Sequence, residues 1–138
     1  MTRRSAEVEI EVPFHDVDMV GIVWHGHYAK YFEIARCALL ESFRYNYMEM
    51  MASGYGWPVI DLRLRYVKPA QFGQKIRVRA TLLEWENRLR IEYLVRDAVS
   101  GERLTKGETV QVAVHIATRE MCLQSPDVLF ERLGVPKP

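Results

Sequence analysis

The sequence predicts a single α+β domain in which a five-stranded antiparallel sheet packs against one long helix. Five segments alternate apolar and polar residues with a period of two, as half-buried strands do, and one long segment has the period of a helix. Short links join the later strands, so strands that follow one another in sequence are expected to pair antiparallel. A length of 138 residues fits one domain, expected here over residues 1–138.

The first strand is predicted at residues 7–14, and a loop follows it. Apolar side chains at alternate positions would face the core: Val8, Ile10, Val12 and Phe14. Residues 15–25 break the alternation, and Asp16, Asp18 and Gly21 are typical of a loop.

The helix is predicted from about residue 26 to residue 53. Its apolar stripe has i, i+3, i+4, i+7 spacing and consists of Tyr28, Tyr31, Phe32, Ala35, Ala38, Leu39, Ser42 and Phe43. Glu33 and Arg36 lie mostly off this stripe, and Gly54 and Gly56 would end the helix.

Four more strands are predicted after Pro58, at residues 60–66, 76–82, 89–95 and 110–116. A short C-terminal helix is predicted to open at Ser125-Pro126-Asp127 and to close at Gly134. One helix cannot cover both faces of such a sheet, so the outer face is expected to be polar or covered by another subunit.

Composition excludes several classes of protein. With 19 basic and 18 acidic residues the net charge is +1, which gives no general attraction to nucleic acid or to an anionic membrane. No segment approaches the ~20 apolar residues of a membrane span, and no secretory signal is recognisable. We therefore expect a cytoplasmic protein in which Cys37 and Cys122 are reduced.

The arginines of the strands are expected to be solvated or ion-paired, with a subset available for the phosphates of an acyl carrier.

The loop before the helix carries the candidate chemistry. Asp16 and Asp18 are separated by one residue, can point in opposite directions and are not expected to share a role; Asp18 is closer to the helix. His25 and His27 have a spacing common among metal ligands. A metal site built from His15, Asp16, Asp18, His25 and His27 is therefore one alternative. In another, His25 contacts a substrate carbonyl or a bound water.

Backbone donors are expected beside these side chains. Gly21 and Gly26 allow close approach of a ligand, and the free N–H groups at the helix start would stabilise an oxyanion. Phosphate-loop and dinucleotide fingerprints are missing, as is a G-x-S-x-G elbow, and Cys37 is expected to be packed and inert. A carboxylate-based mechanism is what these residues favour.

The segment over residues 14–36 resembles the hotdog-fold acyl-CoA thioesterases of the 4-hydroxybenzoyl-CoA thioesterase family. Within that family it looks most similar to the branch associated with Tol–Pal systems. The matching residues are Phe14, Asp16, Asp18, Gly21, Ile22-Val23, Trp24, Tyr28, Glu33 and Arg36, with Tyr66-Val67-Lys68-Pro69-Ala70 ending the second strand. The similarity covers about residues 7–118. It departs from the family at Met19 and Val20, where small residues are frequent, and at His27, where asparagine is common.

This resemblance implies a hotdog fold and hydrolysis of an acyl-CoA without a metal or cofactor. Asp18 matches the catalytic carboxylate, and His25 lies at the mouth of the helix whose amides polarise the thioester carbonyl. Residues implied in substrate binding are Gly21, Trp24, Gly26 and Tyr28. The resemblance also implies a homodimer or homotetramer with the site at a subunit interface. Two alternatives stay open: the metal-dependent hydrolase and a non-catalytic acyl-CoA-binding domain. A double-bond hydratase fits less well.

Overall fold

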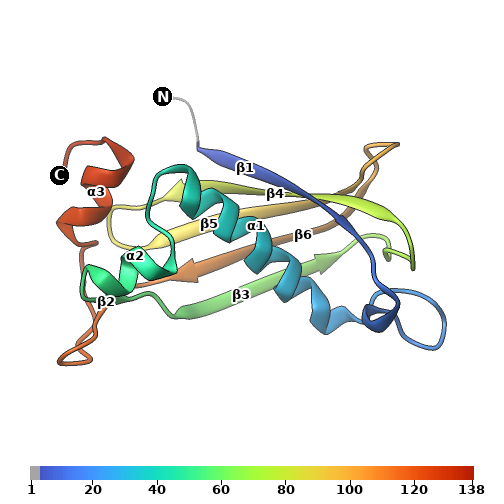
Figure 1. Cartoon of the computed structure of the whole chain (residues 1–138), viewed down its shortest axis with the longest axis horizontal. Coiled ribbons are helices and arrows are strands. Elements are labelled where there is room, and N and C mark those ends of the chain that lie inside the picture. Colours follow the sequence, from blue (N-terminus) through green and yellow to red (C-terminus); the bar gives the residue numbers. More distant parts are fainter. Residues whose placement is uncertain (1–3) are drawn as a thin grey trace.

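The computed structural model describes residues 4–138 and shows a curved sheet wrapped around helix α1 (Tyr28–Ser42) (Figure 1). The sheet is antiparallel, with the strand order β1-β4-β5-β6-β3. Its strands are β1 (Ser5–Glu11), β3 (Val59–Tyr66), β4 (Lys75–Glu84), β5 (Leu89–Asp97) and β6 (Arg103–Gln111). The predicted hotdog fold is confirmed.

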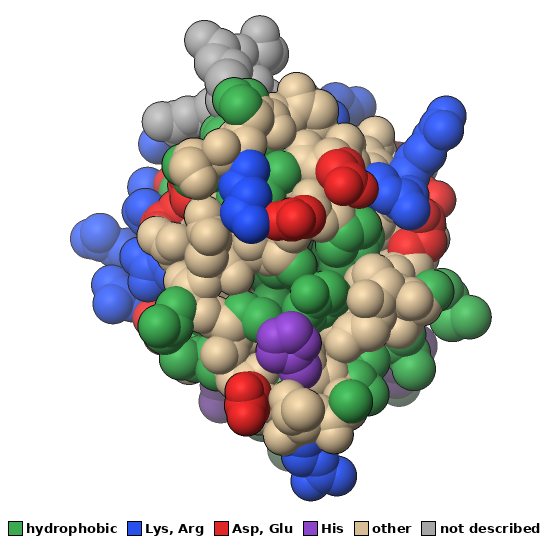
Figure 2. All heavy atoms as spheres, turned by 90° about the vertical axis from the view of Figure 1, so that its left-hand side faces the viewer, with side chains coloured by type: hydrophobic (Ala, Val, Ile, Leu, Met, Phe, Trp, Pro, Cys, Tyr) green, Lys and Arg blue, Asp and Glu red, His purple; other side chains and the backbone are tan. Residues whose placement is uncertain are grey.

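The remaining elements lie at the two ends of the sheet. The 3-10 turns η1 (Phe14–Asp16) and η2 (His25–His27) precede α1, while α2 (Tyr47–Ala52), α3 (Asp127–Leu133) and the paired β2 (Tyr55–Gly56) and β7 (Val114–His115) lie at the opposite end (Figure 1). Figure 2 shows that opposite end, where hydrophobic side chains gather at the centre and charged side chains surround them. Over residues 4–138, no helix has the length and apolar character needed to cross a membrane.

Aromatic packing sets the distance between α1 and the sheet. The Phe32 ring on α1 stacks on the Tyr93 ring of β5, with centroids 4.4 Å apart and planes at 2°. Gly107 of β6 lies directly opposite Tyr93, and a Cβ at Gly107 would be 2.2 Å from the Phe32 ring. The glycine thus permits a close approach that any larger residue would block.

The first strand is shorter than predicted, and the inward position expected for Phe14 is wrong. β1 ends at Glu11, and the N–H of Val12 bonds to the carbonyl of Gln74. Pro13 has no N–H to continue the ladder. Phe14 starts the η1 turn instead, where it is 73% exposed and packs edge-to-face on Phe72.

The single helix predicted over residues 26–53 is also wrong, because the chain breaks between two helices. α1 ends at Ser42, and Arg44 adopts a left-handed conformation with φ of 57°. Asn46 then caps α2 by accepting a hydrogen bond from the N–H of Glu49. Arg36, which the pattern placed off the apolar stripe, is buried and donates to the hydroxyls of Tyr47 and Tyr93.

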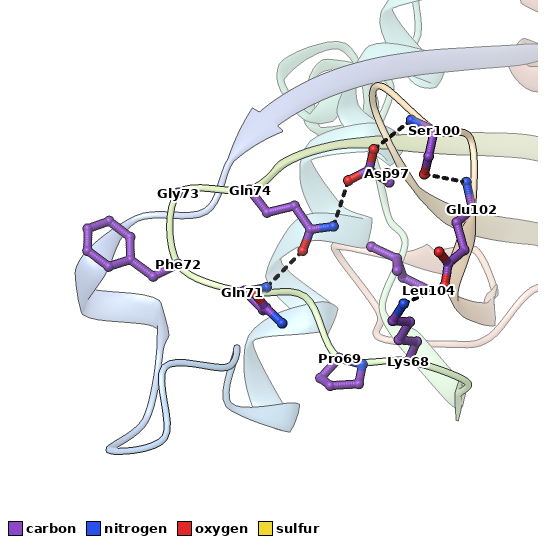
Figure 3. Close-up of a pocket in the computed structure, with 10 residues that line it drawn as sticks. All are labelled: Lys68, Pro69, Gln71, Phe72, Gly73, Gln74, Asp97, Ser100, Glu102 and Leu104. Atoms are coloured by element: carbon purple, nitrogen blue, oxygen red, sulfur yellow. Dashed lines mark hydrogen bonds and ion pairs between the residues drawn. The ribbon is translucent and has the colours of Figure 1, made fainter.

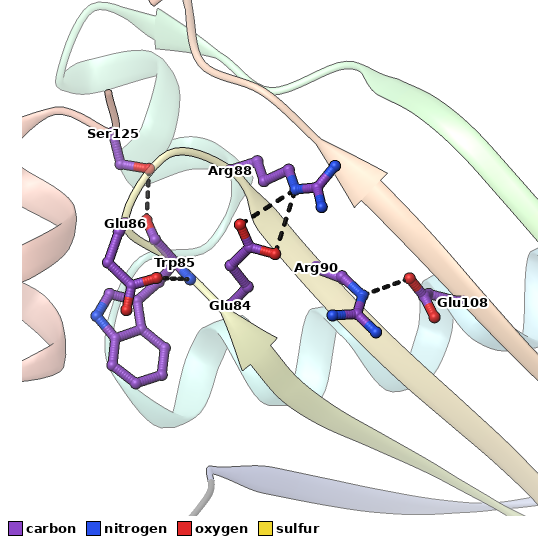
Figure 4. Close-up of polar contacts among 7 residues, drawn as sticks. All are labelled: Glu84, Trp85, Glu86, Arg88, Arg90, Glu108 and Ser125. Carbon is purple, nitrogen blue, oxygen red and sulfur yellow. Dashed lines mark hydrogen bonds and ion pairs between the residues drawn. The ribbon is translucent and has the colours of Figure 1, made fainter. Parts of the chain in front are cut away.

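The last strand of the main sheet lies earlier than predicted. β6 runs from Arg103 to Gln111, and Val114 and His115 pair with β2 in a separate two-stranded sheet. The pattern missed the first half of β6 because its inward side chains are small or polar: Thr105, Gly107 and Thr109. The short C-terminal helix is confirmed as α3, with Gly134 left-handed at its end. Ser125 does not cap it; its hydroxyl donates to the carbonyl of Trp85 (Figure 4).

Candidate active site

The loop before α1 turns its two aspartates in opposite directions. Asp16 is buried and accepts hydrogen bonds from Lys30 Nζ at 2.6 Å and from the Tyr31 hydroxyl at 2.7 Å. Asp18 is exposed, and its Oδ1 accepts the N–H of Val20 at 2.9 Å. Asp16 therefore holds the loop against α1, while Asp18 remains accessible to a substrate.

The pKa of Asp16 shows which effect dominates in its surroundings. Burial alone would raise the pKa of this carboxyl, but the hydrogen bonds from Lys30 and Tyr31 and the nearby charges of Lys30 and His27 outweigh it. The pKa consequently lies below its ordinary value. Asp16 is an anchored anion, bonded to α1 at two points.

Asp18 lines a cleft of about 300 Å³ at the start of α1. Of the residues implied in catalysis or binding, Asp18, Trp24, His25 and Tyr28 lie together in this cleft. Its other lining residues are Ile22, Val23, Tyr66, Val67, Lys68 and Pro69. The cleft brings a carboxylate and an imidazole to the same helix terminus.

Gly21 and Gly26 do not line the cleft. Gly21 shapes the backbone turn beside it, and Gly26 leaves room for the indole of Trp24. Gly21 has φ of 83° and donates its N–H to the carbonyl of Asp18 at 3.0 Å, which closes the turn after the carboxylate. Gly26 lies under the indole of Trp24, so that a Cβ there would be 2.1 Å from the ring. That indole also packs 4.8 Å from the His25 ring and 5.3 Å from the His27 ring.

The start of α1 offers unused backbone donors. His27 precedes the helix without a side-chain cap, and over residues 4–138 the N–H groups of His25 and Gly26 have no protein acceptor. The first amides of a helix carry a partial positive charge, which stabilises a negative ligand atom. A carbonyl oxygen placed there would be polarised.

Tyr66 is a cleft residue that reasoning from the sequence alone did not assign. Its hydroxyl donates to the backbone oxygen of His25 at 2.9 Å, and its ring packs edge-on against Tyr28, 5.4 Å away. Burial and the neighbouring Tyr28 raise the pKa of the Tyr66 hydroxyl, so it remains a proton donor. The signal that could have found it is the Tyr66–Ala70 stretch, since Tyr66, Val67, Lys68 and Pro69 all line the cleft.

The alternative metal site is not assembled. Across the part of the chain that the structure describes, no three His, Cys, Asp or Glu side chains are grouped as a metal site would require. Asp16 is bonded to Lys30 and Tyr31, with His27 Nδ1 3.8 Å from its Oδ1. Asp18 and His25 line the cleft, whereas Asp16 and His27 do not.

The cysteines do not supply a nucleophile to this cleft. Burial raises the pKa of the half-buried Cys37 thiol on α1, which disfavours the reactive thiolate. Cys122 lines a separate hollow of about 390 Å³ at the end of the molecule that carries α2 and α3. The carboxylate in that hollow, Asp127, forms an ion pair with Lys137.

Comparison with known proteins agrees with this geometry. The profile of the family described as the Thioesterase-like superfamily matches residues 12–132. The chain belongs to the thioesterase-like superfamily. It is thus an enzyme that hydrolyses thioesters, which confirms the predicted enzyme class.

Three similar proteins span most of this thioesterase. The Thermus thermophilus protein TT1821, described as hypothetical, is 31% identical with a TM-score of 0.83, and the match covers 94% of this chain and 97% of that one. A DHNA-CoA thioesterase of Staphylococcus aureus is 27% identical with a TM-score of 0.80, covering 86% of this chain and 80% of its own. The Synechocystis protein sll0410, provisionally named an esterase, is 28% identical over 140 residues, which is 96% of this chain and 81% of its own.

Proposed function

We propose that this thioesterase hydrolyses the thioester of an acyl-coenzyme A, with Asp18 as the catalytic carboxylate and His25 as a second catalytic group. The observation that carries the proposal is the shared cleft of Asp18 and His25 at the uncapped start of α1. The name of the similar S. aureus enzyme supports a coenzyme A thioester as substrate. The motif over residues 14–36 supports assignment to the 4-hydroxybenzoyl-CoA thioesterase family and its Tol–Pal-associated branch.

In the proposed reaction the thioester carbonyl oxygen points at the amides of His25 and Gly26. These donors stabilise the negative charge that develops on the oxygen as the carbonyl carbon is attacked. Asp18 either attacks that carbon itself or removes a proton from a water that attacks it. The first route expels the coenzyme A thiolate and leaves an acyl–Asp18 anhydride, which water then opens to the free acid. The second releases thiolate and acid without a covalent intermediate.

Rapid-quench mass spectrometry distinguishes the two routes. A nucleophilic Asp18 predicts a tryptic peptide that carries the mass of the acyl group during the first turnover. A peptide of unmodified mass throughout, with hydrolysis proceeding at the normal rate, assigns Asp18 the role of general base.

Edge strand β3 supports a homodimer as the minimum functional unit. Among residues 4–138, β3 pairs with β6 alone and ends the strand order. Its inward side chains are left partly uncovered by α1: Ile60 is 58% exposed, Leu62 42% and Tyr66 47%. A second copy pairing along β3 would cover this row and bring its own residues beside the cleft. A homotetramer would form by further packing of two such dimers. A Leu62→Arg variant should give monomers in sedimentation velocity and lose hydrolysis with them.

A panel of acyl-CoAs, read by release of the free thiol, tests the proposed activity directly. We expect Asp18→Asn to lower kcat by roughly 10²–10³-fold with the fold retained, and His25→Ala to cause a smaller loss. Two matched controls lie outside the cleft, Asp127→Asn for the carboxylate and His15→Ala for the imidazole, with side chains 70% and 79% exposed. An Asp18→Asn enzyme of normal activity would overturn the mechanism. Tight binding of acyl-CoA without turnover across the panel would instead support a non-catalytic binding domain.

We propose a cytoplasmic location for this thioesterase. Both cysteines are free thiols, as expected for a protein that resides in a reducing compartment.

A further inference from the structure

Four basic side chains gather on the outer face of the sheet, close to the end that holds the cleft. They are Arg65 on β3, Arg96 on β5, and Arg103 and Lys106 on β6, and we call them the cationic patch. Their strand neighbours Val95 and Thr105 are buried toward α1, which places Arg96 and Lys106 on the opposite face. Arg65 shares that face because it lies opposite Lys106. Arg103 shares it because the register shifts between Val95 and Arg96 and sets Arg103 opposite Arg96. Over residues 4–138, none of the four forms an ion pair with a carboxylate.

The strand register sets these charges directly against one another. Arg65 pairs across the ladder with Lys106, and Arg96 pairs with Arg103. Like charges in directly opposed positions destabilise a sheet. The other arginines of the strands have acidic partners, as Arg90 has in Glu108, and so has Arg88 just before β5, which pairs with Glu84 (Figure 4). On its other side Arg96 lies opposite Arg77, which forms ion pairs with Glu7 and Glu9. Among the described residues, the four side chains of the cationic patch have no such partners, and a bound anion would relieve their repulsion.

A second hollow adjoins the cleft at the end of the sheet. It has a volume of about 470 Å³ and shares Lys68 and Pro69 with the Asp18 cleft. Figure 3 shows it between the loop at residues 69–74 and the turn at residues 97–102. Arg96 and Arg103 flank that turn in sequence. A flexible chain that runs from Asp18 past Lys68 through this hollow reaches the turn that the two arginines flank. This route leaves the free edge of β3 available for a second copy.

The carboxylates in this hollow are already engaged. Asp97 accepts hydrogen bonds from the N–H of Ser100, from the Gln74 amide and from the N–H of Val99, and these lower the pKa of its carboxyl to about 2. Glu102 forms an ion pair with Lys68 at 2.8 Å. These bonds fix the two walls of the hollow, and the acidic residues next to Arg96 and Arg103 in sequence have partners of their own (Figure 3).

A third hollow lies on the outer face beside the other half of the patch. Its volume is about 510 Å³, and Arg65 and Lys106 line it together with Arg63, Leu64, Glu92, Gly107 and Glu108. It provides room on the outer face for a bulky group next to the two basic side chains.

We propose that the cationic patch binds the phosphates at the nucleotide end of coenzyme A, while the pantetheine arm lies in the hollow between Lys68 and Asp97. Arginine suits this role because its planar fork can donate two hydrogen bonds to one phosphate. The proposal rests on the proposed function, since the arm must end with its thioester at Asp18.

Binding of adenosine 3′,5′-bisphosphate, measured by titration calorimetry, tests the patch without any turnover. We expect the Arg96→Ala/Arg103→Ala variant to bind this nucleotide at least about tenfold more weakly than the unmodified protein. The control is Arg88→Ala, which removes an arginine that already has an acidic partner and should leave the affinity unchanged. Equal affinities for the double variant and the unmodified protein would overturn the proposal.

Kinetics with two substrates that carry the same acyl group provide a second test. In the double variant, the ratio of KM for acyl-CoA to KM for the acyl-pantetheine, which lacks the nucleotide, should rise about tenfold. An equal rise in KM for both substrates contradicts the proposal, because the substitutions would then affect the cleft itself. A loss confined to acyl-acyl carrier protein also contradicts it and would indicate an acidic protein partner.

Thermal unfolding separates binding from a structural role. Arg96→Ala/Arg103→Ala removes both charges of one opposed pair and should leave the melting temperature unchanged or raise it. Arg65→Ala/Lys106→Ala removes the other opposed pair and is the second variant should the first fail to fold. The two proposals also fail separately. Nucleotide binding that the variants abolish, in a protein that hydrolyses no thioester, contradicts only the proposed function. Normal hydrolysis with nucleotide binding that is insensitive to the variants contradicts only the cationic patch.

Discussion

The Tyr66 hydroxyl donates a hydrogen bond to the backbone oxygen of His25 across 2.9 Å. This contact joins the last residue of edge strand β3 to the turn that opens α1. The strand proposed to meet a second copy is therefore bonded to the residues proposed to polarise the substrate. Any displacement of β3 would be transmitted to the amides of His25 and Gly26.

The Tyr66→Phe variant should keep the fold and lose part of the activity. Loss of this one hydrogen bond is expected to lower the free energy of unfolding by about 1 kcal/mol and kcat by roughly three- to tenfold. Denaturant unfolding and thiol release measure the two effects. Tyr55→Phe, at the other end of the sheet, is the control. Unchanged kcat in Tyr66→Phe would show that the contact does not position the His25 turn.

Replacement of Asp16 should reduce stability in a manner that depends on pH. Asp16→Asn removes the anion bonded to Lys30 and Tyr31, at an expected cost of about 1–3 kcal/mol near neutral pH. The native pKa of Asp16 is lowered, so its contribution is complete above the unfolded pKa of about 4 and is lost as the pH falls through the lower native value. Urea unfolding at pH 6 and pH 3 should show the difference between the two proteins becoming smaller at pH 3. A difference of equal size at both values would contradict this role.

Gly107→Ala should destabilise the protein by about 1–3 kcal/mol, because the added methyl group overpacks the core. Its Cβ would lie 2.2 Å from the Phe32 ring and 2.7 Å from the carbonyl oxygen of Arg63, so either α1 or β3 must shift. Thermal unfolding measures the effect. Gly56→Ala is the matched control, since nothing lies within 4 Å of its added Cβ. Similar melting temperatures for the two variants would mean that α1 does not pack as tightly as the structure indicates.

Gly26→Ala should change the cleft with little effect on stability. The new methyl group collides with the indole of Trp24, which is 50% exposed and can rotate away. We expect a shift in tryptophan fluorescence and a KM raised several-fold for acyl-CoA. A variant with the native fluorescence spectrum and native KM would show that the Trp24 position does not shape substrate binding.

Much of the fold was predictable because its signals are local. Short stretches of sequence predict the alternation in β4 and β5 and the end of α3 at the left-handed Gly134. The break after α1 was not predictable, because the sequence keeps its helical periodicity through this region. The break depends on the left-handed conformation of Arg44 and on the cap that Asn46 provides for α2. In β6, Gly107 breaks the apolar pattern because Phe32 occupies the space its side chain would fill.

The candidate site was predictable where it lies within one segment. Asp18, Trp24, His25 and Tyr28 come from eleven consecutive positions and meet in one cleft. Tyr66 comes from a strand about 40 residues away, and no local pattern reveals that its hydroxyl reaches His25. The buried Arg36 was missed for the same reason, since the hydroxyl of Tyr93 that accepts its hydrogen bond lies 57 positions further along the chain.

The stacked rings of Phe32 and Tyr93 have a consequence for the length of acyl tail that the enzyme can accept. Both side chains have no exposed surface, and Gly107 brings the sheet against them. A tail that entered beneath α1 would have to displace Phe32, at a cost typical of disrupting a packed core. We therefore expect the tail to lie outside this core, across Leu62 and Ile60 of β3 and against the proposed second copy. Chain-length preference should therefore follow substitutions on this exposed row.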